Sequence, residues 1–212
     1  MRLLVVDLLA ERQAFGREGV REIVSHFPAN EVFLWAPHTD ARLDYGFGSV
    51  VEHPVSADAI VITGSRRNVS MWEPWMDDVV ALIHASKVPL YGICFGHQII
   101  AHAFGGRIKR ASTDSHFVAE VVGLNGQSDM AAFAHQEHVV DAGTLDIIAS
   151  ADHCRIAACR HPTRPIYTVQ YHPEAVGVVL DAALACGDMD LSEREAFEDQ
   201  LLTTDVSKAF NF

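Results

Sequence analysis

One stretch, Val88 to Gly106, most limits how this chain can fold. It begins as an apolar run typical of a buried strand. It continues with apolar residues at helical spacing up to Gly105, a residue suited to a left-handed helix cap. Cys94 lies at the junction, with a glycine two residues away on each side. A strand that turns abruptly into a helix strains its central residue and leaves little room beside it. The spacing therefore predicts a nucleophile elbow, with Cys94 projecting from the carboxyl edge of a sheet.

The position of Cys94 at a helix N-terminus also suits reaction chemistry. The helix dipole and the free N–H groups there favour a thiolate and a developing oxyanion. The alternative is a buried cysteine that only packs between a strand and a helix. The two glycines and the polar pair His97-Gln98 favour the elbow. The elbow alone leaves hydrolase, transferase and redox sensor open.

Composition limits the class of protein and its partners. The chain has 212 residues, of which 49% are hydrophobic, and no linker divides it, so we expect one domain over residues 1–212. Its net charge of −12 argues against nucleic acid and anionic membranes as partners. Four scattered cysteines fit no disulfide framework and indicate the reducing cytoplasm. We expect neither a signal peptide nor a membrane-spanning helix.

The first half of the chain alternates strands and helices. Apolar runs predict strands over residues 3–6, 32–35 and 58–65, and helical spacing predicts helices over 12–27 and 72–86. Residues 37–56 are expected to form a loop. This alternation predicts an α/β fold with an open, mostly parallel sheet covered by helices on both faces.

After Gly106 the pattern changes to short, partly alternating runs separated by turn residues, which predict a small antiparallel extension of the sheet. A further apolar run over 166–170 predicts the strand that leads to His172. Helices are expected over 175–185 and 192–202, the second with Ser192 and Glu195 as a capping box.

A cysteine nucleophile needs a base, and the base needs a group that orients it. Twelve histidines compete for this role. His172 stands out because it follows a hydrophobic strand, where parallel sheets place reactive groups, and Glu174 lies two residues further on. An ordinary strand-end histidine is the alternative. Four histidines beside prolines or in polar loops are expected to be exposed: His26, His38, His53 and His161.

Two motifs together carry a family resemblance. Gly92-Ile93-Cys94-Phe95-Gly96-His97-Gln98 and Gln170-Tyr171-His172-Pro173-Glu174 resemble the triad-type class I glutamine amidotransferases, in particular the stand-alone branch similar to the glutaminase domain of GMP synthetase. The resemblance covers Leu3 to Glu174 and leaves 175–212 as a C-terminal helical segment. It implies a flavodoxin-like layering of helices and sheet.

The resemblance implies a role for each matching residue. Cys94 would attack the side-chain amide of glutamine, His172 would carry the thiol proton to departing ammonia, and Glu174 would orient His172. Water would then cleave the γ-glutamyl thioester. An amide is a poor electrophile, so a thiolate, an oxyanion clamp and a proton donor are all needed.

Further residues are expected around this triad. The resemblance implies an oxyanion hole from the backbone N–H groups of Phe95, Gly64 and Ser65. It implies substrate contacts from Gln98 and from the segment that contains His135 and Glu137, where Glu137 replaces the family's Asp and puts recognition there in doubt. His135 and His138 have the spacing of strand neighbours as well as of metal ligands, so we expect no metal and no cofactor.

Three functions remain open at this stage. The first is a glutaminase that supplies ammonia to a separate synthetase subunit, since no acceptor segment follows Glu174. The second is a stand-alone hydrolase of γ-glutamyl peptides or conjugates. The third is a non-catalytic regulatory or binding subunit, against which the intact set of Cys94, His172 and Glu174 argues.

Overall fold

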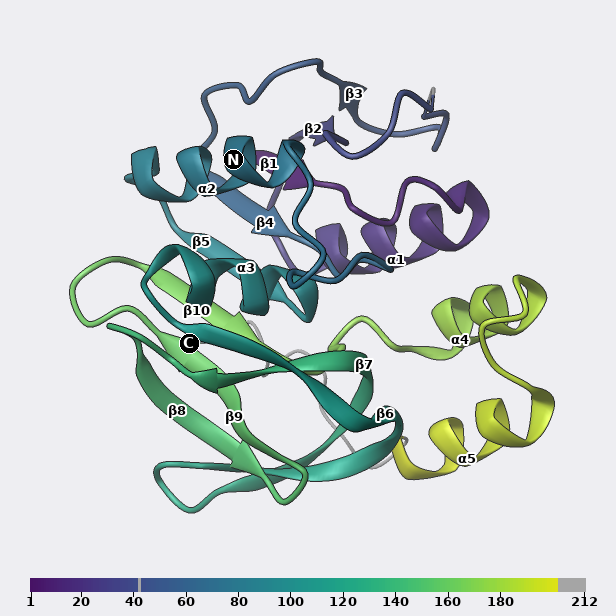
Figure 1. Cartoon of the computed structure of the whole chain (residues 1–212). Helices are drawn as coiled ribbons and strands as arrows, with labels where there is room; N and C mark the ends of the chain where they lie inside the picture. Colours follow the sequence, from purple (N-terminus) through teal and green to yellow (C-terminus); the bar gives the residue numbers. More distant parts are fainter. Residues whose placement is uncertain (42, 202–212) are drawn as a thin grey trace.

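The computed structural model describes residues 1–41 and 43–201, apart from the side chain of Leu201. These residues form one ten-stranded sheet in the order β3-β2-β1-β4-β5-β10-β9-β8-β6-β7, flanked by helices (Figure 1). The strands are β1 Arg2–Val6, β2 Glu31–Trp35, β3 Ser49–Val50, β4 Ala59–Ile62, β5 Leu90–Ile93, β6 Arg107–Gly123, β7 Ser128–Asp141, β8 Asp146–Ala151, β9 Cys154–Arg160 and β10 Ile166–Val169. The helices are α1 Gln13–Ser25, α2 Trp75–Ala85, α3 Phe95–Ala103, α4 Gly177–Ala185 and α5 Leu191–Leu201.

The six strands from β3 to β10 are parallel, as the sequence predicts. Successive side chains of a strand point to opposite faces. Leu3 and Val5 of β1 accordingly pack in the core on the side of α1, whereas Leu4 and Val6 pack in the core beneath α2 and α3. Because both faces are covered, the strands read as continuous apolar runs rather than as alternating ones. The predicted α/β architecture is confirmed.

The other four strands form the antiparallel extension. It is larger than the short hairpins expected from the sequence, because β6 spans 17 residues and β7 spans 14. Their pairing shifts register between Arg110 and Ser115, where the two strands bend. β7 also contacts the segment that follows β10, because the N–H of His172 donates to the carbonyl of Ala132 at 2.8 Å. The antiparallel extension therefore lies beside the segment that contains His172.

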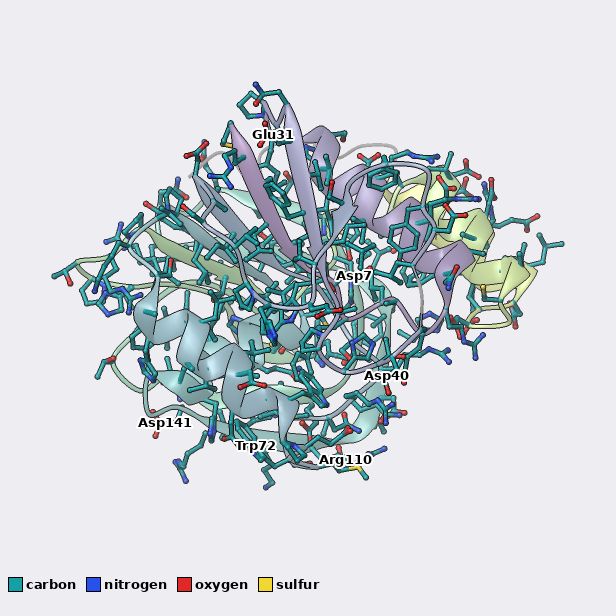
Figure 2. The ribbon with its side chains drawn as sticks, turned by 90° about the horizontal axis from the view of Figure 1, so that it is seen from above. Asp7, Glu31, Asp40, Trp72, Arg110 and Asp141 are labelled. Carbon is teal, nitrogen blue, oxygen red and sulfur yellow. The ribbon has the colours of Figure 1, made fainter. Side chains whose placement is uncertain are left out.

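The carboxyl ends of the central parallel strands meet at one edge of the sheet. Asp7 follows β1, Thr63 follows β4, Cys94 follows β5 and Gln170 follows β10. Asp7 is fully buried, and viewed from above it lies near the middle of the molecule, while Glu31 and Asp141 lie toward its rim (Figure 2). Open parallel sheets bind ligands at this edge, so we expect the functional site there.

Several boundaries differ from those predicted. The helix expected from residue 72 begins at Trp75, directly after Pro74, a residue that suits a helix start. The loop expected over 37–56 contains the two-residue strand β3. His38, expected to be exposed, is buried and its ring packs edge-on against Trp75. His53 is exposed as expected, whereas His26 and His161 are half-buried.

The C-terminal segment forms two helices, and α4 packs against α1 while α5 packs against β6 and β7 (Figure 1). The predicted capping box is wrong by two residues. Asp190 and Glu193 bond each other's backbone N–H groups at 2.8 Å, in place of Ser192 and Glu195. Residue 202 of the predicted helix lies outside the described residues, as does the rest of the segment. Within the described ranges, no helix has both the length and the apolar character to cross a membrane.

Candidate active site

Cys94 lies at the abrupt junction of β5 and α3 and has φ 50° and ψ −100°. Among the residues that the structure describes, it is the one non-glycine residue with a positive φ. A Cβ atom at Gly96 would lie 2.3 Å from the carbonyl oxygen of Ile62, and one at Gly92 would lie 2.7 Å from the backbone of Gly96. The two glycines are therefore required by close backbone contacts, and the predicted elbow geometry is present.

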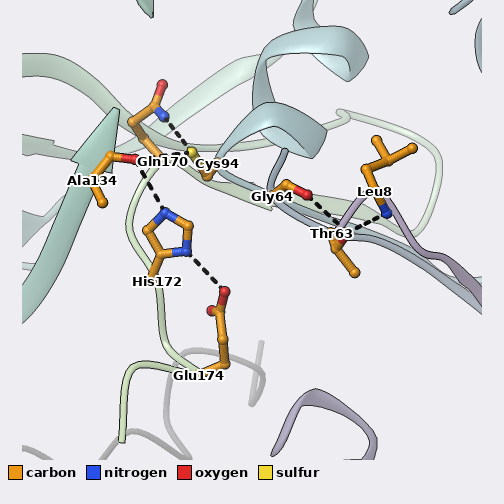
Figure 3. A network of polar contacts seen from close by, with 8 residues as sticks. All are labelled: Leu8, Thr63, Gly64, Cys94, Ala134, Gln170, His172 and Glu174. Carbon is orange, nitrogen blue, oxygen red and sulfur yellow. Dashed lines mark hydrogen bonds and ion pairs between the residues drawn. The ribbon is translucent and has the colours of Figure 1, made fainter. Parts of the chain in front are cut away.

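His172 and Glu174 form a hydrogen-bonded pair just beyond β10. His172 donates its Nδ1–H to Oε1 of Glu174 at 2.8 Å, and the carboxylate is almost fully buried. Their order along the chain places the carboxylate on the far side of the imidazole from Cys94 (Figure 3). With Nδ1 bonded to Glu174, the other imidazole nitrogen, Nε2, lies on the side of the elbow.

The carbonyl oxygen of Ala134 links the cysteine and the histidine. The Cys94 thiol donates to this oxygen at 3.7 Å, and His172 Nε2 lies 3.4 Å from it (Figure 3). Ala134 belongs to β7, the strand that also accepts the N–H of His172 through Ala132. The antiparallel extension therefore positions the imidazole next to the thiol. No sequence signal marked Ala134, because its backbone carbonyl rather than its side chain makes the contacts.

The charge on His172 follows from its neighbours. Burial alone would lower its pKa, but the attraction of Glu174 and then of Cys94 outweighs burial and holds the pKa of His172 well above 6.5. The ring therefore favours the imidazolium form at neutral pH, which has N–H donors on both nitrogens. An imidazolium in this place can deliver a proton to a departing amine.

Gly64 lies directly beside these groups. A Cβ atom there would stand 3.1 Å from Cε1 of His172 and 3.7 Å from Cβ of Cys94. The Thr63 hydroxyl donates to the Gly64 carbonyl and accepts the N–H of Leu8, both at 2.9 Å (Figure 3). Ser65 follows, and its hydroxyl accepts the N–H of Arg67. The loop predicted to contribute to the oxyanion hole is thus fixed next to the thiol.

Phe95, the other residue predicted at the oxyanion hole, is the first residue of α3. The N–H groups in the first turn of a helix have no partner within the helix. In α3 the carbonyl of Cys94 accepts the N–H of Gln98. The N–H of Phe95 precedes that bond and adjoins the cysteine, which suits an oxyanion donor.

A chain of side-chain amides leads from β7 to the thiol. Nε2 of Gln98 donates to the carbonyl of Glu137 at 2.7 Å and to Oε1 of Gln170 at 3.2 Å. Nε2 of Gln170 in turn donates to Sγ of Cys94 at 3.7 Å. Both amide hydrogens of Gln98 are therefore engaged within the site. Gln170 had no role in the sequence analysis, although it belongs to the motif that ends at Glu174.

His135 and Glu137, predicted to contact the substrate, are both buried at the wall of the site. Burial and then the charge of His172 lower the pKa of His135 to about 3, so its ring is neutral. The Glu137 carboxylate accepts the N–H of Ser70 at 3.2 Å through Oε2. Glu137 therefore ties β7 to the segment before α2.

A cavity of about 630 Å³ lies over these residues. Cys94, Phe95, Ser65, Gln98, His135, Glu137, His172 and Glu174 all line it. Eight of the nine predicted site residues thus share one cavity, and the ninth, Gly64, lies against Cys94 and His172.

The other three thiols are free and do not belong to this constellation. Burial raises the pKa of Cys154 and of Cys159 to about 12, so both are inert thiols inside β9. Residues 1–41 and 43–201 hold no group of three or more His, Cys, Asp or Glu side chains placed to bind a metal ion.

The family model of class-I glutamine amidotransferases matches residues 39–185, which include the elbow and the His172–Glu174 pair. The chain belongs to the class I glutamine amidotransferase family. This agrees with the resemblance found in the two motifs.

Similar members of the family include subunits of glutamine-hydrolysing GMP synthase. The protein from Methanococcus aeolicus is 43% identical over 98 residues, which are 42% of this chain and 52% of the relative. The protein from Methanocaldococcus jannaschii is 37% identical over 100 residues, with the same shares of 42% and 52%. The matched stretch therefore spans about half the length of these curated relatives.

Solved structures of family members have the same fold. A glutamine amidotransferase from Thermotoga maritima superimposes with a TM-score of 0.76 at 12% identity and covers 99% of this chain and 94% of its own. A GMP synthase subunit from Thermoplasma acidophilum gives a TM-score of 0.63 at 18% identity, with coverage of 100% and 96%. These solved structures thus share the overall fold over nearly the whole chain.

Proposed function

We propose that the chain hydrolyses the side-chain amide of glutamine through a thioester on Cys94. One observation carries this proposal: a strained elbow cysteine and the histidine of the His172–Glu174 pair share the Ala134 carbonyl. A thiol at such a junction next to an imidazolium has the two groups that amide cleavage needs. The match to the amidotransferase family supports glutamine as the source of the amide.

The first step breaks the amide bond. With the thiol proton of Cys94 transferred to His172, the thiolate attacks the γ-carbonyl carbon. The oxyanion is stabilised by the N–H of Phe95 and by the Gly64-Ser65 loop. The carbon–nitrogen bond then breaks while the His172 imidazolium gives its proton to the leaving nitrogen. Ammonia departs, and the γ-glutamyl group stays on sulfur as a thioester. Glu174 keeps the imidazole oriented throughout.

The second step releases glutamate. Neutral His172 takes a proton from water, and the resulting hydroxide attacks the thioester carbonyl. The carbon–sulfur bond breaks, and the thiolate and the imidazolium are restored. Gln98, His135 and Glu137 line the same cavity as Cys94, which suits contacts with the rest of the substrate.

We expect the ammonia to serve a separate acceptor, such as a synthetase subunit, in the cytoplasm. The similarity to subunits of glutamine-hydrolysing GMP synthase supports this arrangement. Free ammonia is largely protonated at neutral pH and lost, so a donor gains from working only when its acceptor is docked. The four free cysteines favour a reducing compartment.

A second candidate function uses the same residues. Hydrolysis of γ-glutamyl peptides or conjugates is favoured by the size of the cavity, which exceeds what a free amino acid needs. In that case the leaving group is an amine rather than ammonia.

Steady-state kinetics of the purified chain tests the proposal. We expect glutamate and ammonia to appear from glutamine in equal amounts, at a low rate that rises when an acceptor synthetase is added. Fast hydrolysis of a γ-glutamyl conjugate by the chain alone, well above the rate for glutamine, would favour the second candidate. Absence of glutamate from any of these substrates would contradict both.

A further inference from the structure

The cavity over Cys94 continues well beyond the residues that glutamine hydrolysis uses. Its volume of about 630 Å³ lies within the range of roughly 300–1,000 Å³ that holds drug-sized ligands. The additional part extends between the C-terminal helices, α1 and β7. Six apolar residues line this part, beside the polar residues Ser115, His116 and Asp188: Phe15, Val179, Leu180, Ala183, Met189 and Phe197. We name this part the apolar chamber.

The apolar chamber lies on the leaving-group side of Cys94. Cys94, His172 and Glu174 follow one another in one direction (Figure 3). Ala175 follows Glu174 in the chain and lines the same cavity, and α4, which supplies three of the chamber residues, begins at Gly177. The leaving nitrogen must lie next to His172 to receive its proton. A substituent on that nitrogen therefore points toward α4.

The charged groups near the chamber are already paired. Arg66 and Arg12 both form ion pairs with Asp188, and Arg12 also donates to the carbonyl of Cys186. His116 on β6 bonds Glu193 of α5 at 3.1 Å. The apolar side chains of the chamber favour an uncharged group, because a carboxylate buried beside them without a partner costs free energy.

We propose that this chain accepts γ-glutamyl amides whose amine carries a neutral apolar substituent, which binds in the apolar chamber. The inference rests on the proposed thioester chemistry of Cys94. The reaction is balanced in the same way as with glutamine: the carbon–nitrogen bond breaks, His172 protonates the leaving amine, and water later releases glutamate. The only difference is that a primary amine leaves in place of ammonia.

Four substrates test the inference: glutamine, γ-glutamyl-methylamide, γ-glutamyl-isopentylamide and γ-glutamyl-leucine. Methylamine and isopentylamine are similarly basic, so their amides differ in apolar surface and not in leaving-group chemistry. We expect kcat/KM to be at least tenfold higher for the isopentylamide than for the methylamide, because buried apolar surface stabilises binding. γ-Glutamyl-leucine is the isopentylamide with one added carboxylate, and we expect it to lose most of this gain.

A matched pair of variants locates the effect. Ala183 lines the chamber, whereas Ala185 lies in the same helix and is exposed. Ala183→Phe should bring the ratio of kcat/KM for the isopentylamide to kcat/KM for the methylamide close to one. Ala185→Phe should leave this ratio unchanged. The methylamide rate of each preparation reports whether that variant is folded.

The outcomes separate the two proposals. Hydrolysis of glutamine and methylamide without preference for the isopentylamide would overturn the apolar chamber and leave the glutaminase. A preference that Ala183→Phe does not reduce would also overturn it, as would a higher kcat/KM for γ-glutamyl-leucine than for the isopentylamide. No hydrolysis of any of the four substrates would overturn the proposed function and the inference with it.

Discussion

Gly64 stands so close to His172 that a Cβ atom on the glycine would lie 3.1 Å from Cε1 of the imidazole. The same atom would lie 3.7 Å from Cβ of Cys94. Gly64 has no positive φ, so its need for glycine comes from the space between nucleophile and base and not from its backbone conformation.

Gly64→Ala should therefore impair catalysis more than folding. The added methyl group displaces the imidazole, and small displacements of reacting groups can cost up to about 10²-fold in rate. We expect kcat for glutamine to fall roughly 10–100-fold. Gly177→Ala is the control, since a Cβ atom there meets nothing within 4 Å. Equal rates for Gly64→Ala and the wild type would contradict the tight arrangement at this loop.

The second prediction concerns pH. The pKa of His172 is raised, so the imidazolium form persists at neutral pH and is lost as pH rises through the raised pKa. Activity that needs the imidazolium should therefore have its basic limb above pH 6.5. Glu174 makes the largest contribution that raises this pKa. Glu174→Gln should move the basic limb of kcat/KM to lower pH and cost part of the rate, whereas His172→Ala should cost roughly 10²–10⁴-fold.

The control for this pH profile is Glu193→Gln. Glu193 also bonds a histidine, His116, but that pair lies outside the triad. Its loss should leave the basic limb where it is. If Glu174→Gln does not shift the limb either, another histidine is the base.

The third prediction concerns strain at the elbow. Cys94 has φ 50°, a region in which non-glycine residues cost of order 1–3 kcal/mol. Cys94→Gly relieves this strain and Cys94→Ala does not, although both remove the sulfur. We expect Cys94→Gly to be the more stable of the two by about 1 kcal/mol in urea unfolding, because the relief of strain exceeds the stability that glycine loses through its greater freedom in the unfolded chain. Equal stability of the two variants would show that the strain energy at position 94 is no larger than the stability that glycine loses through its freedom in the unfolded chain.

The sequence predicted the parts of the site that lie in local patterns. In the Gly-x-Cys-x-Gly stretch and in the run 166–174, residues close in sequence set the local geometry. The elbow and the His172–Glu174 pair could therefore be predicted without knowing the fold. Ala134 could not be predicted, because it acts through a backbone carbonyl that reaches the site only when β7 passes beside His172. The capping box was misplaced because Asp190/Glu193 and Ser192/Glu195 fit the same pattern, and only the start of α5 decides between them.

Thr168 illustrates the same limit. It lies in β10, and no local pattern assigns it a role. Its hydroxyl lies 2.7 Å from Nδ1 of His97, whose other nitrogen lies 3.2 Å from the carbonyl of Ile156. Burial lowers the pKa of His97 to about 4, so the ring is neutral and each nitrogen has a partner.

The fourth prediction follows from this buried contact. Thr168→Val keeps the shape of the side chain but leaves Nδ1 of His97 without a partner, which typically costs about 1–3 kcal/mol. Thr113→Val, an exposed position on β6, should change the free energy of unfolding by less than about 0.5 kcal/mol. Equal unfolding midpoints for the two variants would show that the His97–Thr168 contact contributes nothing to stability.

The central claim is that Cys94 alone among the four thiols carries the reaction. It is tested most directly by measuring glutamate release from glutamine by purified Cys94→Ala, beside Cys154→Ser, Cys159→Ser and Cys186→Ser. We predict no glutamate above background from Cys94→Ala and near-normal rates from the other three, with circular dichroism showing that all four are folded. Glutamate release by Cys94→Ala at the wild-type rate would contradict the account.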